Sequence, residues 1–270
     1  MITRRVVIKI GGSVLVDENA FADVAIKLAG YLRKNPEVER LYVIVSAMKG
    51  KTERIIGELA PEAAARSQLQ RSLQGAVGVH RENGVWERPR HSLALLWGEI
   101  EAAHLLYEAL GAQGLRAKVV TQLGPYPIAT EGAYLHGRLD IAESRRRFGE
   151  FERACRGERI VILSGFGAVN ARSEPTLFGR NASDYVAAIL SALDPKVELV
   201  LFLKDVGGIF EGFRTAAERR IAVTDVERLR ESRCGQVLDG RVLDIIACDF
   251  HVVGSDLESG GTIVHRARTA

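Results

Sequence analysis

Apolar positions along the chain follow two spacings that alternate. The short β-branched run Val6–Ile10 is followed by a glycine turn and then by Asn19–Lys34, where apolar residues recur at helical spacing. The same order repeats with Leu41–Val45 as a strand and Thr52 to about Gln70 as a helix. Strands that alternate with helices favour a parallel, doubly wound sheet, so the pattern predicts an α/β protein.

The remaining segments extend this pattern to the end of the chain. Strands are predicted at Arg116–Thr121, Arg159–Leu163, Glu198–Leu203, His251–Gly254 and Thr262–Val264, and helices at Leu93–Leu110, Ser183–Leu193 and Asp239–Ala247. The stretch Ser72–His91 is irregular and charged. The segment Pro125–Arg138 contains several Pro and Gly breakers, which predict hairpins and loops that could cover a substrate.

No linker or internal repeat divides the sequence. We therefore expect a single domain over residues 1–270, with a lobe of about residues 1–195 and a second lobe of about residues 196–270. The helix Leu93–Leu110 carries apolar residues on more than one face. Two interpretations stay open for it: burial within the core, or packing of its second face against another subunit.

Composition narrows the class of protein. The 270 residues are 47% apolar and 26% charged, enough for a substantial buried core. Lys and Arg number 37 against 34 Asp and Glu, so we expect no nucleic-acid partner, although a local basic site for a phosphorylated ligand fits the balance. The three cysteines lack paired spacing, and no apolar stretch approaches the roughly 20 residues of a membrane span. A reducing, cytoplasmic location without membrane contact is expected.

Glycine-bearing loops supply the first chemical signal. After the first strand, Gly11 and Gly12 would let backbone N–H groups approach an anion closely, and Lys9 could neutralise charge on a transferring phosphoryl group. The alternative is that Lys9 is a solvated residue at a strand end. The loops Ser46–Lys51, Ser164–Gly167 and Asp205–Gly208 also follow predicted strands, and in a parallel sheet such loops share one edge. The common nucleotide-binding fingerprints with their longer Gly spacing are absent.

Six short motifs, in the same order along the chain, are similar to motifs of aspartokinases in the amino acid kinase superfamily. They are Lys9-Ile10-Gly11-Gly12-Ser13, Val43-Ile44-Val45-Ser46-Ala47-Met48, Trp97-Gly98-Glu99, Gly179-Arg180-Asn181-Ala182-Ser183-Asp184, Lys204-Asp205-Val206-Gly207-Gly208-Ile209-Phe210 and Gly260-Gly261-Thr262-Ile263-Val264. The resemblance implies a three-layer α/β/α sandwich around a mainly parallel sheet, with the acceptor in the N-terminal lobe and ATP-Mg²⁺ in the C-terminal lobe. It also implies a catalytic domain without the ACT regulatory domains, which would begin near residue 270, and a homodimer or higher homo-oligomer.

Site residues follow from the resemblance position by position. As catalytic residues it implies Lys9 and Asp184. As nucleotide-binding residues it implies Gly11, Gly12, Lys204, Asp205, Phe210, Arg214 and Gln236, and as acceptor-binding residues Ser13, Ser46, Ala47, Glu99, Arg180 and Ser183. Arg180 would hold a substrate carboxylate with its planar guanidinium. Glu99 and Asp184 would face the substrate amino group or orient the lysines, and the alternative for both is a structural ion pair or a helix cap.

Departures from the family pattern concern the identity of the substrate and the rate of nucleotide turnover. Asn181-Ala182 stands where the family has Gly-Gly, and Gly207 replaces an aspartate beside the nucleotide. Gln236 replaces a lysine that serves the nucleotide phosphates in the family, so Lys204, Lys49 or Lys51 would compensate or turnover would be weak.

The expected activity is ATP- and Mg²⁺-dependent phosphorylation of a small carboxylate, aspartate or a relative, to an acyl phosphate. A carboxylate is already ionised near neutral pH and needs no general base, in agreement with the lack of a convincing base among the six histidines. Two alternatives remain: another branch of the superfamily, acting on N-acetylglutamate, an unusual amino acid or a small phosphate, and a catalytically silent nucleotide- or anion-binding protein.

Overall fold

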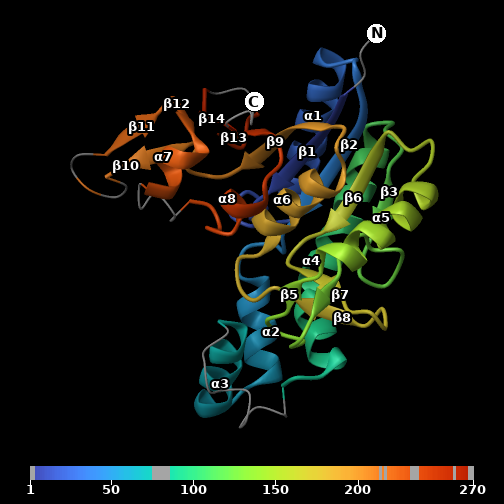
Figure 1. Cartoon of the computed structure of the whole chain (residues 1–270), viewed down its shortest axis with the longest axis vertical. Helices are drawn as coiled ribbons and strands as arrows, with labels where there is room; N and C mark the ends of the chain where they lie inside the picture. The colour runs from blue at the N-terminus through green and yellow to red at the C-terminus, as the bar shows by residue number, and fades with distance from the viewer. Residues whose placement is uncertain are drawn as a thin grey trace.

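The fold is organised around an eight-stranded sheet. The computed structural model describes residues 4–74, 86–212, 215, 218–231, 237–257 and 260–266. The strands lie in the order β12-β14-β13-β9-β1-β2-β6-β3, and all neighbours are parallel except β13 and β14. The expected mainly parallel sheet is therefore confirmed (Figure 1).

The strands of this sheet are β1 (Arg4–Ile10), β2 (Val38–Val45), β3 (Lys118–Val120), β6 (Ile160–Ser164), β9 (Val197–Leu203), β12 (Val223–Asp225), β13 (Asp249–Val253) and β14 (Thr262–His265). Three short hairpins are formed by β4 (Thr130–Glu131) with β5 (Arg138–Leu139), β7 (Gly167–Val169) with β8 (Pro175–Leu177), and β10 (Ile209–Glu211) with β11 (Arg219–Ile221). The helices are α1 (Asn19–Lys34), α2 (Lys51–Leu59), α3 (Ala63–Leu73), α4 (Pro89–Ala112), α5 (Ile141–Ala154), α6 (Ser183–Leu193), α7 (Val226–Glu231) and α8 (Val242–Ile245).

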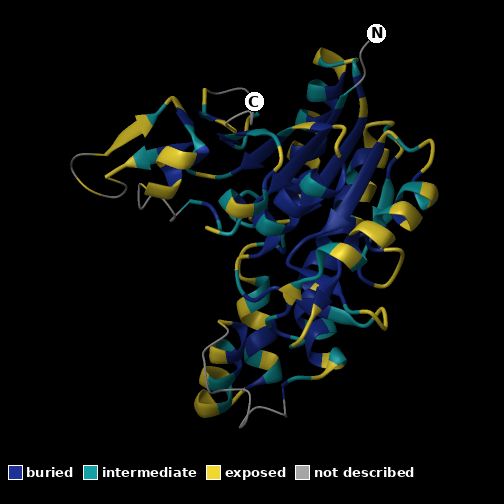
Figure 2. Ribbon diagram, in the orientation of Figure 1, coloured by how far each residue is buried: buried dark blue, intermediate teal, exposed yellow. Residues whose placement is uncertain are grey.

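Helices cover both faces of the central strands, which gives three layers. Val7 of β1 packs in a cluster with α6, whereas its neighbours Val6 and Ile8 pack in a second cluster with α1. Successive side chains of a strand point to opposite faces, so a strand covered on both sides has apolar residues throughout. Figure 2 shows the resulting buried centre, with exposed residues on the outer helices. The α/β/α sandwich is confirmed.

One long helix expected over Thr52 to about Gln70 is instead two helices. α2 ends at Leu59 and α3 begins at Ala63. Pro61 lies between them and has no backbone N–H to continue the helical hydrogen bonds. In Figure 1 the two helices extend below the sheet, beside the first part of α4.

The helix α5 was not predicted from the sequence. Its segment is rich in Arg and Glu, which hides the apolar spacing, although Phe151 is buried in the core. A capping signal was present, because the Asp140 carboxylate accepts a hydrogen bond from the Glu143 backbone N–H at 3.0 Å. Arg147 is buried through its ion pair with Glu143, so this helix is fixed partly by charge pairing.

The helix predicted over Asp239–Ala247 is wrong in extent, since only Val242–Ile245 is helical. The residues just before it form turns in which a backbone N–H donates to the carbonyl three residues earlier, such as Val242 N–H to the Asp239 carbonyl at 3.0 Å, and Arg241 adds side-chain contacts. The short elements between β9 and α8 were also not predicted, because strands of three residues carry too little periodicity to recognise.

The long helix α4 is mostly buried on two sides, as one of the two interpretations expected. Leu96 belongs to one core cluster and Leu106 to the other, whereas Trp97 is 53% exposed and Tyr107 46% exposed. No helix within the described ranges has an apolar stretch long enough to cross a membrane.

A buried ionic network closes the end of the sheet where β1 begins. The Arg5 guanidinium contacts Asp194 at 2.7 Å and Glu152 at 2.9 Å, and the Tyr42 hydroxyl donates to Asp194 at 2.8 Å. Asp194 follows α6 directly and Glu152 lies on α5. The network therefore joins two helices to the central strands.

We predict that Asp194→Ala lowers the free energy of unfolding by about 3 kcal/mol, because the buried guanidinium of Arg5 loses its best-buried partner. Urea unfolding followed by circular dichroism measures the loss. As a control, Glu58→Ala removes the exposed Arg54–Glu58 pair on α2 and should change stability by under about 0.5 kcal/mol. A loss below about 1 kcal/mol in Asp194→Ala would contradict the structural role of the network.

Candidate functional site

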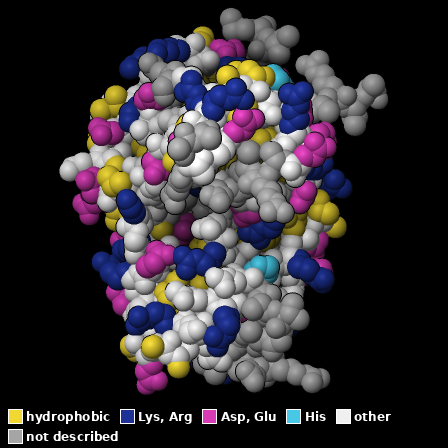
Figure 3. Space-filling view, turned by 90° about the vertical axis from the view of Figure 1, so that its left-hand side faces the viewer, with side chains coloured by type: hydrophobic (Ala, Val, Ile, Leu, Met, Phe, Trp, Pro, Cys, Tyr) yellow, Lys and Arg dark blue, Asp and Glu magenta, His cyan; other side chains and the backbone are white. Residues whose placement is uncertain are grey.

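A cavity of about 650 Å³ opens at the carboxyl ends of the central strands. Residues that follow β1, β2, β6 and β9 line it together with the start of α6 and residues 237–241. This is the sheet edge at which the glycine-bearing loops were expected to converge. Figure 3 shows a hollow on this side of the molecule, with basic and acidic side chains around it.

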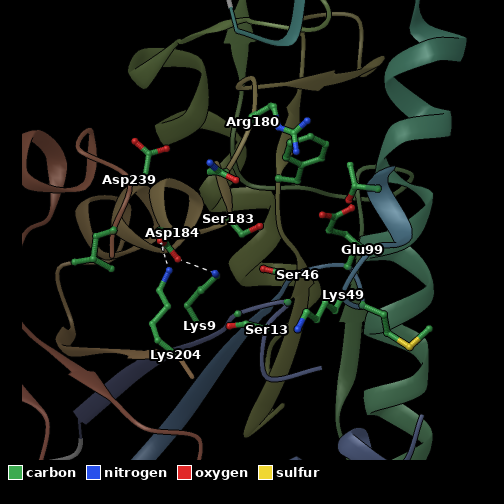
Figure 4. Close-up of a pocket in the computed structure, with 18 of the residues that line it drawn as sticks. Lys9, Ser13, Ser46, Lys49, Glu99, Arg180, Ser183, Asp184, Lys204 and Asp239 are labelled. Atoms are coloured by element: carbon green, nitrogen blue, oxygen red, sulfur yellow. Dashed lines mark hydrogen bonds and ion pairs between the residues drawn. The ribbon is translucent and has the colours of Figure 1, made fainter. Parts of the chain in front are cut away.

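Two lysines share one carboxylate at the base of the cavity. Lys9 on β1 places its Nζ 2.7 Å from Asp184 Oδ1, and Lys204, which directly follows β9, places its Nζ 2.6 Å from Asp184 Oδ2 (Figure 4). Lys9 and Asp184 are both buried, so the alternative of a solvated strand-end lysine is wrong. Two ammonium groups against one carboxylate leave a positive charge that can attract an anion.

The same burial sets the protonation of this cluster. Burial lowers the pKa of Lys9 to about 8, although Asp184 opposes the shift. For Asp184, burial alone would raise the pKa, but the charges of Lys9 and Lys204 outweigh it and keep the pKa below its usual value. Asp184 is therefore a permanent anion, whereas Lys9 can change charge in the mildly alkaline range.

The glycines predicted to approach a phosphate fit closely between neighbouring loops. A Cβ at Gly12 would lie 2.6 Å from the carbonyl oxygen of Ala47, and one at Gly11 would lie 3.0 Å from the carbonyl oxygen of Leu203. Larger residues would push the β1 loop away from its neighbours. Ser13 donates its hydroxyl to Asp205 at 2.9 Å, so it is fixed by the loop after β9.

Glu99 lies on α4 and is only 3% exposed. Burial raises the pKa of its carboxyl to about 8, with the backbone of Ala47 opposing the shift. Its Oε2 atom is buried without a hydrogen-bond partner among the described residues. A buried oxygen left in this way is costly unless a ligand supplies a donor.

Arg180 also lines the cavity, in a loop whose backbone is unusual. Gly179 has φ +80° and Asn181 has φ +60°, and a Cβ at Gly179 would lie 2.5 Å from the carbonyl oxygen of Leu73. Arg180 forms an ion pair with Glu53 of α2. Ser183 also lines the cavity, at the first residue of α6. The partner Glu53 was not predicted, because nothing in the sequence links α2 to a loop 127 residues away.

A second residue missed in the sequence is Arg241. Its guanidinium donates to Asp239 at 2.5 Å and to the Phe178 carbonyl at 2.6 Å, and it lies 4.7 Å from the centre of the Tyr185 ring. These contacts attach residues 237–241, which line the cavity, to the loop that carries Arg180. Only an isolated Asp-x-Arg pair marked this segment in the sequence.

The structure brings together most of the predicted site residues. Those that line the cavity are Lys9, Gly11, Gly12, Ser13, Ser46, Ala47, Glu99, Arg180, Ser183, Asp184 and Lys204. Asp205 and Phe210 are not among the lining residues, although Asp205 holds Ser13. Arg214 and Gln236 lie outside the described residues. The segment Pro125–Arg138 does not contribute to the lining, so the expectation that it covers this site is wrong.

Charge in the cavity is positive overall. Its described lining contains five basic side chains (Lys9, Lys49, Lys204, Arg180 and Arg241) and four acidic ones (Glu53, Glu99, Asp184 and Asp239). Lys49 forms no ion pair within the described part of the chain, whereas Lys51 is paired with Glu101 at 2.6 Å. No group of three described His, Cys, Asp or Glu side chains is arranged to hold a metal ion. The lining therefore fits phosphate groups better than it fits a protein-bound metal.

Comparisons with known proteins agree with this geometry. The sequence profile of the amino acid kinase family matches residues 4–267. An aspartokinase of Rickettsia prowazekii is 27% identical over 196 residues, covering 72% of this chain and 40% of its own length, and an aspartate kinase of Pseudomonas fluorescens is 25% identical over 271 residues, covering 96% and 58%. The chain thus spans about half the length of these relatives.

Solved structures show the same fold at low identity. The crystal structure of E. coli aspartokinase III in complex with aspartate and ADP has a TM-score of 0.75 at 22% identity, covering 97% of this chain and 64% of that one. The isopentenyl phosphate kinase of T. acidophilum, in a product complex, has a TM-score of 0.52 at 16% identity, covering 97% and 100%. Since the family profile covers nearly the whole sequence and the fold agrees, the chain belongs to the amino acid kinase family.

Proposed function

We propose that this chain is an ATP-dependent kinase that phosphorylates the carboxylate of a small amino acid, aspartate or a close relative, to an acyl phosphate. The observation that carries the proposal is a single cavity in which the Lys9–Asp184–Lys204 cluster faces Glu99 and Arg180. The test is an ATP-consumption screen over acidic amino acids and their acylated relatives, with hydroxylamine trapping of the acyl phosphate. ATP consumption without hydroxamate for any carboxylate acceptor would overturn the proposal.

The lysine cluster is the phosphoryl-transfer half of the site. ATP, when bound, supplies the transferable phosphoryl group, and the residues that would hold its phosphates are Lys9, Gly11, Gly12 and Lys204. Phosphoryl transfer depends on positioning and on charge stabilisation more than on covalent chemistry by the protein. Asp184 fixes the two ammonium groups, so little reorganisation is needed when charge develops. Mg²⁺ would be coordinated mainly by phosphate oxygens, because no three described His, Cys, Asp or Glu side chains are grouped to hold a metal ion.

Arg180 and Glu99 form the acceptor half. The guanidinium of Arg180 suits a carboxylate, and the unpartnered Oε2 of Glu99 suits an ammonium group. When ionised, the buried Glu99 carboxyl disfavours a phosphate acceptor, which would bring further negative charge, and an N-acylated acceptor, which lacks the ammonium. The reacting carboxylate needs no base, and no described histidine lines the cavity.

We also propose that the exposed part of α4 packs against a second copy of the chain. Trp97 and Tyr107 are large, exposed aromatic residues on a helix in which 11 of 24 residues are buried. Sedimentation at micromolar concentration should show a homodimer or larger assembly, and Trp97→Asp should shift it toward monomer by removing apolar contact area. A wild-type monomer under these conditions would contradict this proposal.

Alanine substitutions of Lys9 and Arg180 should change different kinetic constants. Lys9→Ala should lower kcat by roughly 100- to 1,000-fold, because the lost ammonium stabilises charge that develops during transfer. Arg180→Ala should raise the acceptor KM by roughly 10- to 100-fold with a smaller change in kcat, because a charge-assisted contact is lost from ground and transition states alike. Initial rates at saturating ATP-Mg²⁺ give both constants, with the exposed Arg54→Ala as a control. An unchanged acceptor KM in Arg180→Ala would misplace the acceptor site.

The acceptor kcat/KM should be bell-shaped in pH, with its maximum near pH 8. Glu99, with its pKa raised to about 8, becomes an ammonium-binding anion only as pH rises, which gives the acid limb. Lys9, with its pKa lowered to about 8, loses its charge as pH rises further, which gives the alkaline limb. Glu99→Gln should remove the acid limb and Lys9→Arg the alkaline limb. Persistence of both limbs in both variants would contradict this assignment.

A further inference from the structure

The acceptor-binding arginine is already occupied in the structure. Glu53, in the first turn of α2, lines the same cavity as Arg180 and pairs with its guanidinium. The Glu53 side chain is 57% exposed and that of Arg180 is 31% exposed, so solvent screens the pair. Such exposed pairs contribute little net stability, so an incoming carboxylate can displace Glu53 when it also brings a partner for the released charge.

A second carboxylate lies close to this pair. Glu99 and Glu53 line the same cavity, and the charge of Glu53 adds to the causes that raise the pKa of Glu99. In Figure 4, Arg180 and Glu99 lie on one side of the cavity and the Lys9–Asp184–Lys204 cluster lies on the other. The acceptor side therefore presents one guanidinium and two carboxyl groups.

Charge balance then decides which acceptor fits. In the free site, Arg180 and Glu53 neutralise each other. When an acceptor places a carboxylate against Arg180, Glu53 loses its partner and two negative groups compete for one guanidinium. Two carboxylates beside one guanidinium repel each other, and this repulsion disfavours binding of the acceptor unless a cation lies next to them. An ammonium group on the acceptor, next to its carboxylate, restores the balance by pairing with Glu53 and Glu99.

We propose that Glu53 determines acceptor specificity: by filling the Arg180 guanidinium in the free site, it makes the cavity select carboxylates that carry a neighbouring ammonium group over the same carboxylates without one. This inference rests on the proposed function and assigns a residue to its substrate choice. The selectivity comes from repulsion between Glu53 and a carboxylate that lacks an ammonium group, in addition to attraction for a carboxylate that carries one.

Glu53 could instead serve only to stabilise α2. A carboxylate in the first turn of a helix interacts favourably with the helix dipole, and α2 has no side-chain cap. A purely structural role would change folding or the active fraction equally for every acceptor. The ratio of kcat/KM between two acceptors, measured on one preparation, is insensitive to such changes and isolates the specificity effect.

The experiment compares aspartate with succinate, which is aspartate without its amino group. Glu53→Gln keeps the side-chain size and removes the charge, so succinate should gain access to Arg180. We expect the aspartate-to-succinate ratio of kcat/KM to fall fivefold or more in Glu53→Gln, to change less in Glu53→Asp, and to stay within twofold of wild type in Glu58→Gln, a matched change on the same helix outside the cavity. A fall of less than fivefold in Glu53→Gln, or an equal fall in Glu58→Gln, would overturn the inference.

A second measurement separates this inference from the proposed function. Phenylglyoxal modification of Arg180, followed by peptide mass spectrometry without any acceptor, should be several-fold faster in Glu53→Gln than in wild type. Equal rates would overturn the inference whatever the enzyme phosphorylates. If wild type shields Arg180 but forms no acyl phosphate from aspartate, the proposed function fails. In that case, the preference for aspartate over succinate is measured from the concentrations that protect Arg180 against phenylglyoxal, and it should fall fivefold or more in Glu53→Gln. Protection by neither compound would overturn the inference.

Discussion

The site depends on the two ion pairs that the Asp184 carboxylate forms with Lys9 and Lys204. A buried carboxylate without partners would be neutral or destabilising, and Lys9, whose pKa is lowered by burial, would lose its proton more easily without the carboxylate. The three charges come from β1, α6 and the end of β9, so satisfying them fixes the relative position of a helix and two strands. The excess positive charge that remains is aimed into the cavity. Structural and chemical requirements are met by the same three side chains.

The parallel sheet explains why this cluster forms at one edge. β1 and β9 are neighbours in register, with Lys9 beside Phe202 and Ile10 beside Leu203, so the residues that follow them emerge together. α6 begins at the same edge and presents Asp184 in its first turn. The shared edge is a consequence of strand direction, whereas the sign and number of the charges belong to this sequence.

Much of this arrangement could be predicted from the sequence because its signals are local. β1 was predicted because Val6, Val7 and Ile8 form an apolar run, and α1 and α6 were predicted with their observed bounds because their apolar spacing is regular. The glycines and Lys9 were predicted because a short motif carries them. The Arg180–Glu53 pair and the Arg241 contacts could not be predicted, since they join segments far apart in the chain whose packing only the fold decides. α5 was missed for a related reason, because its buried Arg147 depends on a charge partner and does not contribute to apolar periodicity.

The distance between the two halves of the site is set by small residues. Ala47, in the loop after β2, lies between the β1 loop and α4: its carbonyl oxygen would be 2.6 Å from a Cβ at Gly12, and its own Cβ would be 2.8 Å from a Cβ at Gly98. Gly12 follows the strand of Lys9, and Gly98 precedes Glu99. A larger side chain at either glycine would move α4 or the β1 loop outward, and Glu99 would move away from Lys9. Close backbone packing at three positions without bulky side chains thus holds the Glu99 carboxyl and the Lys9 ammonium at a fixed separation, as the proposed in-line transfer between two bound ligands would require.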